Sequence, residues 1–305
     1  MEVDVIEKDV PSSDGIHVLK GKLYIPQGEI KALFHVVHGM TEYIDRYDRF
    51  MKSVAAEGFL VFGYDNLGHG KTAGEKENLG FIAHKKGWDY LARDVFTFAD
   101  EVKKDYPELK YYLMGHSMGS FIVRCSAAFY KKPDKLIIMG TGGPNAFAGA
   151  GLALVKTAKL LKGEKYRSKF VDRLTFGKYN ERFKGESDEH CWLTKNKEVR
   201  ERFDNDEYCN FKFTLSAMCD LIKLNKMSNS GRFYEEIDKK MPIFLIAGSD
   251  DPVGDYGDGV RKVYRKLISA GANARISLYD GCRHEILNDT SEEAVTEEIK
   301  DFLNT

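Results

Sequence analysis

The chain has 305 residues, of which 43% are hydrophobic and 30% are charged. This length suits one large domain that carries an insertion, because single hydrophobic cores stop growing at roughly 250 to 300 residues. The 46 Lys and Arg residues nearly cancel the 47 Asp and Glu residues, which excludes the strong positive field that collects nucleic acid. We therefore expect a globular protein without a nucleic-acid partner, whose electrostatic features are local.

The N-terminus and the cysteines bear on where the protein is located. Three acidic side chains lie among the first eight residues, where a secretory signal needs a basic start and an unbroken apolar run. No later uncharged run of about 18 apolar residues is long enough for a membrane span. The five cysteines are odd in number and lack the paired spacing of zinc or redox motifs. These features predict a cytoplasmic protein with reduced, space-filling thiols and with neither a metal site nor a cofactor.

In chain order, the first predicted strand covers residues 16–25, where apolar and polar side chains alternate before Pro26. This pattern favours one arm of an antiparallel pair. Short continuous apolar runs separated by helical stretches follow, at residues 32–37, 59–64, 111–114, 136–139, 243–247 and 276–279. Strands alternating with helices are typical of a doubly wound, mostly parallel α/β sheet. Because ligands of such sheets bind beyond the carboxyl ends of the strands, the loops after these runs should carry the chemistry.

Apolar residues at helical spacing predict helices near residues 47–55, ended by Gly58, and near residues 118–129. The alternation of strands and helices lapses between residues 144 and 234, which we interpret as an inserted, mainly helical cap. The core then consists of residues 1–143 and 235–305.

One helix of the predicted cap has a distinct apolar face. Phe147, Leu154 and Leu161 share this face, and Gly163 is placed to end the helix. The face either packs on the core or forms a partly exposed apolar lid that meets lipid. The sequence leaves both alternatives open.

Residues 115–119 read Gly-His-Ser-Met-Gly and match the pattern Gly-x-Ser-x-Gly. The pattern arises by chance in roughly one chain of this length in ten, so its context decides its meaning. Here it follows a predicted buried strand and opens a predicted helix, as a nucleophile elbow requires. The glycines let a sharp turn close, and the helix N-terminus favours developing negative charge. We therefore predict Ser117 to be a nucleophile.

A serine hydroxyl needs a base to take its proton and an acid to hold that base in the useful tautomer. Among the eight histidines, His284 follows the last predicted strand, where the chain order serine, acid, histidine expects the base. The loop after residues 243–247 offers two adjacent acids, Asp250 and Asp251. We prefer Asp251, because Pro252 restricts the backbone beside it, and keep Asp250 as the alternative.

Attack on a carbonyl creates an oxyanion, and each preorganised donor that meets it contributes on the order of 3 kcal/mol. One predicted donor is the backbone N–H of Met118, which follows the nucleophile, and the other is that of Met40 in the loop after residues 32–37. His38 is interpreted as a residue that braces this loop. Residues 64–70 resemble a small metal or phosphate loop, but their weak ligand capacity favours a structural turn.

Five segments together resemble the monoacylglycerol lipase and lysophospholipase group of α/β-hydrolases, in a bacterial-type branch: residues 38–40, 65–70, 115–119, 248–253 and the loop of His284. The resemblance spans nearly the whole chain and is weakest in the cap. It implies an α/β-hydrolase fold and a triad of Ser117, Asp251 and His284. It also implies an oxyanion hole made by the amides of Met40 and Met118, an acyl-enzyme mechanism, and a cap that shapes an apolar acyl tunnel.

Charge is unevenly distributed in the cap. Residues 156–184 hold ten Lys and Arg against three Asp and Glu, whereas residues 185–210 hold eight acids and four bases. The basic stretch is either a solvated face or a surface that docks on anionic lipid or a phosphate head group.

The leading prediction is a serine carboxylic-ester hydrolase whose partner is a small acyl ester, such as a monoacylglycerol or a lysophospholipid. One alternative is an aminopeptidase-like enzyme of the same fold, in which cap acids among residues 186–189 would hold a free N-terminus. Another is a ligand-binding homologue with slow turnover. The sequence leaves the oligomeric state open.

Overall fold

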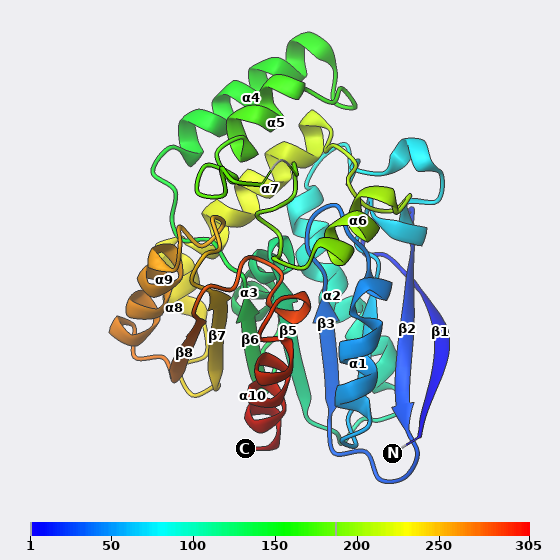
Figure 1. Ribbon diagram of the computed structural model, residues 1–305. Helices are drawn as coiled ribbons and strands as arrows, with labels where there is room; N and C mark the ends of the chain where they lie inside the picture. The colour runs from blue at the N-terminus through cyan, green and yellow to red at the C-terminus, as the bar shows by residue number, and fades with distance from the viewer. Residues whose placement is uncertain (1, 187) are drawn as a thin grey trace.

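A single eight-stranded sheet runs through the computed structural model, which describes residues 2–186 and 188–305 (Figure 1). The strand order is β1-β2-β4-β3-β5-β6-β7-β8. The strands are β1 (Val3–Pro11), β2 (Val18–Pro26), β3 (Leu33–Val37), β4 (Leu60–Tyr64), β5 (Tyr111–His116), β6 (Lys135–Met139), β7 (Ile243–Gly248) and β8 (Ala274–Tyr279). β2 runs antiparallel to both neighbours, and the pairs from β4 to β8 are parallel. The prediction of a mostly parallel α/β sheet is confirmed.

Helices cover both faces of the sheet. They are α1 (Asp48–Ala55), α2 (Gly87–Lys103), α3 (Met118–Phe129), α4 (Ala148–Lys162), α5 (Lys169–Phe176), α6 (Lys197–Asn205), α7 (Leu215–Ser228), α8 (Gly231–Glu236), α9 (Asp258–Ser269) and α10 (Glu292–Asn304). Apolar side chains of α1 and α10 pack in one core, and those of α2, α3 and α9 pack in the other. Short 3₁₀ helices are η1 (Ile44–Tyr47), η2 (Gly70–Ala73), η3 (Lys76–Asn78) and η4 (Ile286–Asn288). This double covering explains why the parallel strands read as continuous apolar runs.

The edge strand β1 was missed by the sequence interpretation. It pairs with β2 over its whole length, from Val3 opposite Pro26 to Pro11 opposite Val18. Only Val10 of β1 is buried, so an edge strand that lies largely in solvent carries little of the apolar signal from which strands are predicted.

The region between β6 and β7 contains helices α4 to α8, of which α4 and α5 lie farthest from the sheet (Figure 1). Helix α4 ends at Gly163, whose φ of 88° suits a residue without a Cβ, as predicted. It packs against α7 and buries Val155, so the helix packs on the core, but through other residues than Phe147, Leu154 and Leu161. Those three side chains are exposed at 80%, 40% and 77%, in agreement with the alternative of an exposed apolar lid.

The five cysteines are all buried and form no disulfide within the described parts of the chain, in agreement with the prediction of space-filling thiols. Among residues 2–186 and 188–305, no helix combines the length and the apolar character that crossing a membrane requires.

Candidate active site

Ser117 lies on the sharp turn between β5 and α3. Its φ of 54° and ψ of −120° are strained for a residue with a side chain, and such strain concentrates at functional sites. The flanking glycines are needed for packing, because a Cβ at Gly115 would overlap the carbonyl of Gly119, and a Cβ at Gly119 would overlap the carbonyl of Val37. The side chain of Ser117 is half-buried, and its Oγ makes no hydrogen bond with another described residue. The turn therefore presents a free hydroxyl above the sheet.

His284 and Asp251 meet in the loops after β8 and β7. His284 Nδ1 lies 2.9 Å from Asp251 Oδ2, and the Asp251 side chain is fully buried. The other carboxylate oxygen of Asp251 accepts a hydrogen bond of 2.8 Å from the N–H of Val253. Asp250 is half-buried, and its carboxylate makes no hydrogen bond with another described residue. Because Nδ1–H faces a carboxylate, the Nε2 of His284 is left as a proton acceptor.

The ring of His284 lies beside the elbow. It is 4.8 Å from the ring of His116, the residue before Ser117, and a Cβ at Gly140 would lie 3.3 Å from its Cε1. Ser117 N–H donates to Met139 O at 3.0 Å, which fixes the elbow to the end of β6. No hydrogen bond joins Ser117 Oγ to His284 in the described chain. Catalytic hydrogen bonds of this type often tighten only when substrate binds.

Two unused backbone donors lie on either side of Ser117. Met118 is the first residue of α3, and Met40 belongs to the loop after β3. A Cβ at Gly39 would lie 3.0 Å from Ser117 Cβ, so this loop runs directly against the turn of Ser117. The N–H groups of Met40 and Met118 donate to no acceptor among residues 2–186 and 188–305. Both are therefore available to an oxyanion.

His38 braces the loop of Met40, as predicted. Its Nδ1 lies 2.8 Å from Gly39 O, and its Nε2 accepts a hydrogen bond of 2.8 Å from Asn66 N–H. Burial lowers the pKa of His38 to about 4, so the ring stays neutral and can accept this bond. The prediction of a structural turn at residues 64–70 also holds, since the buried carboxylate of Asp65 accepts hydrogen bonds from the N–H groups of Ile44 and Lys71.

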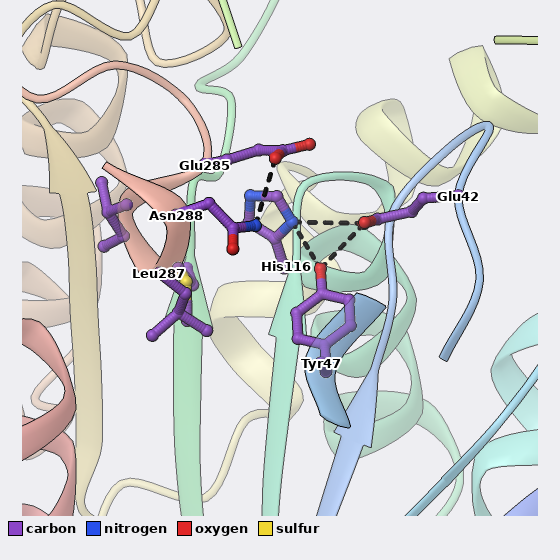
Figure 2. A pocket seen from close by; sticks show the side chains of 8 residues that line it. Glu42, Tyr47, His116, Glu285, Leu287 and Asn288 are labelled. Carbon is purple, nitrogen blue, oxygen red and sulfur yellow. Dashed lines mark hydrogen bonds and ion pairs between the residues drawn. The ribbon is translucent and has the colours of Figure 1, made fainter. Parts of the chain in front are cut away.

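A buried polar cluster lies beneath the elbow; we call Glu42, Arg46, Tyr47, His116 and Glu285 the inner network. All but Arg46 are drawn in Figure 2. Arg46 pairs with Glu285 at 2.6 and 2.7 Å and with Glu42 at 2.9 Å. Glu42 also accepts from Gly39 N–H at 2.6 Å. The cavity lined by Glu42, Tyr47, His116 and Glu285, among others, has about 10 Å³, the space of one water molecule. The inner network thus joins the loop of Met40, the elbow and the loop of His284.

Burial opposes charge in the inner network, and its partners overcome that cost. Burial alone would raise the pKa of Glu42, but its hydrogen bond with His116 and the charge of Arg46 hold that pKa well below its usual range. Burial alone would lower the pKa of His116, and the hydrogen bond and charge of Glu42 raise it instead. The carboxylate of Glu42 is therefore ionised at neutral pH.

The cap also contacts the loop of His284. The N–H of His284 donates to Trp192 O at 3.4 Å, and that of Glu285 donates to Leu193 O at 2.7 Å. The Trp192 ring lies 5.2 Å from the His284 ring. Arg283 donates to Cys191 O at 2.5 Å. Residues 191–194 are thus tethered to the loop that carries the base.

Glu186 and Asp188, in the segment between β6 and β7, are engaged in ion pairs. Glu186 pairs with Arg283, and it pairs with Arg200 at 3.1 Å. Asp188 pairs with Arg200 at 2.5 Å. Asp188, His190 and Asp204 form the one group of potential metal ligands in the described chain, with ligand atoms within 4.8 Å of one another. The guanidinium of Arg200 already neutralises Asp188, which weakens this group as a cation site.

Sequence reasoning missed the inner network and the contacts of Trp192 and Arg283. The four-residue spacing of Glu42, in the loop before η1, and Arg46, within η1, was a local signal for part of it. The acid–base pair that flanks His284, Arg283 and Glu285, was another. Neither signal indicated which residue, distant in the sequence, would form an ion pair with each of these side chains.

The site can now be compared with known proteins. A family described as "Serine aminopeptidase, S33" matches residues 28–291. The chain belongs to this family. Monoglyceride lipase from Mus musculus is 26% identical over 310 residues, covering 98% of this chain and 91% of the relative.

Solved structures agree with this assignment. A thermostable carboxyl esterase from Bacillus coagulans, in complex with glycerol, is similar with a TM-score of 0.93 and 30% identity over 98% of both chains. A structure described as a lipase in its open form is similar with a TM-score of 0.90 and 25% identity, covering 99% of this chain and 98% of the other. The predicted α/β-hydrolase fold and the resemblance to monoacylglycerol lipases are confirmed.

Proposed function

We propose that the protein is a serine hydrolase that cleaves a carboxylic ester of a lipid-like molecule, such as a monoacylglycerol or a lysophospholipid. The observation that carries the proposal is the strained elbow of Ser117 beside the pair of His284 and Asp251. The names of the similar proteins, a monoglyceride lipase and a carboxyl esterase, support the ester and lipid character of the substrate.

In the proposed reaction, His284 Nε2 takes the proton of Ser117 as Oγ attacks the ester carbonyl. Asp251 holds Nδ1–H and stabilises the imidazolium that forms. The oxyanion is met by the N–H groups of Met40 and Met118, which have no other acceptor among the described residues. The alcohol leaves with the proton from His284, and a water molecule, deprotonated by the same ring, then releases the acid from Ser117.

A fluorophosphonate probe tests the nucleophile directly. We expect Ser117 to be labelled in the folded protein and the Ser117→Ala variant to remain unlabelled. The matched control is Ser120→Ala, which removes a nearby buried hydroxyl and should still label at Ser117. Absence of labelling in folded wild-type protein would refute the proposal.

The family description makes an aminopeptidase a second candidate, and the engagement of Glu186 and Asp188 argues against it. Glu186 is paired with Arg283 and Arg200, and Asp188 with Arg200, so these carboxylates are not free to hold a substrate ammonium. We expect nitrophenyl esters to be cleaved, with a preference that depends on acyl-chain length, and an aminoacyl nitroanilide to be cleaved at least ~100-fold more slowly. The opposite order would favour the peptidase.

We also propose that residues 144–234 act as a cap whose outer face contacts anionic lipid. The side chains of Leu160 and Leu161 on α4 and of Phe170 and Leu174 on α5 are exposed at 87%, 77%, 66% and 59%. Exposed lysines and arginines lie among them on the same two helices, at positions 156, 162, 169 and 173. An apolar surface rimmed by positive charge is complementary to an anionic bilayer.

Vesicle sedimentation distinguishes this surface from a merely solvated one. We expect binding to vesicles that contain an anionic phospholipid, weaker binding to purely zwitterionic vesicles, and a loss of binding as salt is raised. Equal binding to both kinds of vesicle, or none to either, would remove the proposal of lipid contact and leave that of ester hydrolysis intact.

A further inference from the structure

His116, the residue before the nucleophile, has hydrogen-bond partners on both of its ring nitrogens. Nδ1 lies 2.7 Å from Tyr47 Oη and 3.3 Å from Glu42 Oε1. Nε2 lies 3.2 Å from the carbonyl oxygen of His284. Figure 2 shows the ring between Glu42 and Tyr47 on one side and the loop of Glu285 on the other. A carbonyl can only accept, so Nε2 must carry a proton.

The protons of Tyr47 and Glu42 decide the state of Nδ1. The Tyr47 hydroxyl has one hydrogen, and it donates to Glu42 Oε1 at 2.8 Å. That oxygen belongs to a carboxylate, which also accepts from Gly39 N–H and has no proton to give. With its hydrogen on Glu42, the Tyr47 oxygen accepts from His116. In this arrangement both nitrogens of His116 are protonated.

The charges of the inner network lead to the same conclusion. Glu42 and Glu285 are two buried carboxylates, and Arg46, which contacts both, is a single guanidinium. Their side chains are exposed by 5%, 4% and 11%, and that of His116 by 5%. With a neutral His116 the cluster keeps one uncompensated buried negative charge, which is costly. With a protonated His116 its charges sum to zero.

We infer that His116 is an imidazolium at neutral pH that holds the loop of Met40 and the loop of His284 in register on the elbow. One N–H acts on Glu42 and Tyr47, and Glu42 in turn fixes Gly39, the residue before the proposed donor Met40. The other N–H acts on the backbone of His284 itself. His116 is thus a positioning residue that contacts no substrate. This role rests on the proposed ester hydrolysis, whereas its protonation state does not.

The other groups that face the ring support a stable charge. Glu42, Arg46 and Tyr47 come from the segment after β3, and His284 and Glu285 come from the loop after β8. His38, from the same side as Glu42, stays neutral because burial lowers its pKa to about 4. Two carboxylates and one guanidinium therefore act on His116, in agreement with the raised pKa of its ring.

Nitrogen NMR of the histidine rings tests the inference on the intact wild-type protein. At pH 7.5 we expect both nitrogens of His116, assigned by their loss in His116→Gln, to show protonated shifts. His35, His38 and His69 serve as internal controls, because burial lowers their pKa values to about 3, 4 and 3, and they should appear neutral. A neutral tautomer of His116 would overturn the inference.

Glu42→Gln tests the coupling between charge and position. In this variant Arg46 and Glu285 balance each other, so His116 should lose its proton at pH 7.5. The rate of Ser117 labelling and kcat should fall on the order of 10²-fold with KM nearly unchanged, because positioning is lost while no substrate contact is removed. The matched control Glu77→Gln, at an exposed site on η3, should change neither measurement.

The outcomes separate the two proposals. If His116 remains protonated and active-site labelling is unchanged in a folded Glu42→Gln protein, the inference fails while the ester hydrolase stands. If wild-type Ser117 is never labelled but His116 shows two protonated nitrogens, the proposed function fails while the imidazolium stands.

Discussion

Beneath Ser117, Arg46 lies between two carboxylates, and each buried charge has an opposite charge in contact. On the outer face of α4 and α5, Leu160 and Leu161 are exposed and the neighbouring lysines largely face solvent. In the first region every charge has its partner within the chain, and such a satisfied, buried network is rigid and insensitive to salt. In the second region, the exposed leucines are not covered by any of the described residues. The proposed chemistry therefore lies in a region that the chain completes by itself, and the proposed lipid contact lies in a region that it leaves open.

The largest effect is expected when the acid of the proposed triad, beside the inner network, is removed. Asp251→Asn should lower kcat about 10⁴-fold, because an amide favours the wrong tautomer of His284. Steady-state hydrolysis of a short nitrophenyl ester measures this loss. Asp250→Asn is the matched control and should stay within about twofold, as is usual for changes away from special contacts. A large loss in Asp250→Asn alone would reassign the acid.

A smaller effect is expected in the incomplete region. Replacing Leu160 and Leu161 together by serine should weaken binding to anionic vesicles at least ~10-fold, since burying each leucine in lipid is worth roughly 1.5 to 3 kcal/mol. Hydrolysis of a soluble short ester should not change, because neither residue lies near Ser117. Ile16→Ser removes an equally exposed apolar side chain, 78% exposed, at the β1–β2 turn. The same loss of binding in this control would show that the effect is not specific to the cap.

The smallest effect concerns a buried histidine that lacks the charged partners of His116. His35 stacks on Phe62, and burial lowers its pKa to about 3, with His38 at about 4 and His69 at about 3. The unfolded chain binds these protons below about pH 6.5. Their neutral burial therefore contributes stability above pH 6.5, and this is lost as pH falls toward 4.

Replacing His35 by leucine tests this dependence. Between pH 6 and 4.5, the slope of the unfolding free energy against pH should become shallower by about 1.4 kcal/mol per pH unit, which is one proton. Urea titrations of wild type and variant at several pH values measure the difference. An unchanged slope would mean that His35 already takes up its proton in the folded state.

The sequence predicted much of the sheet because parallel strands buried on both faces give continuous apolar runs. Predicted residues 59–64 became β4, and 243–247 became β7, each within one residue at either end. Failure came where one side of an element faces solvent. β1 buries only Val10, and α4 packs through Val155 rather than through the face of Leu154.

The candidate site was predictable only in part, for a related reason. Ser117 and His284 were predicted because a motif and a strand end mark them locally. The pair of Arg46 and Glu285 joins residues 239 positions apart, and no local pattern specifies such a partner. The role inferred for His116 likewise depends on three segments that only the fold brings together.

The backbone bonds between residues 191–194 and the loop of His284 have a consequence for protein engineering. This part of the cap must move with the base, whereas α4 and α5 have no such link to it. A chimaera that exchanges residues 148–176 with those of a related hydrolase should therefore change acyl selectivity without disturbing the base. An exchange extended through residue 194 would also replace the backbone contacts that hold the loop of His284.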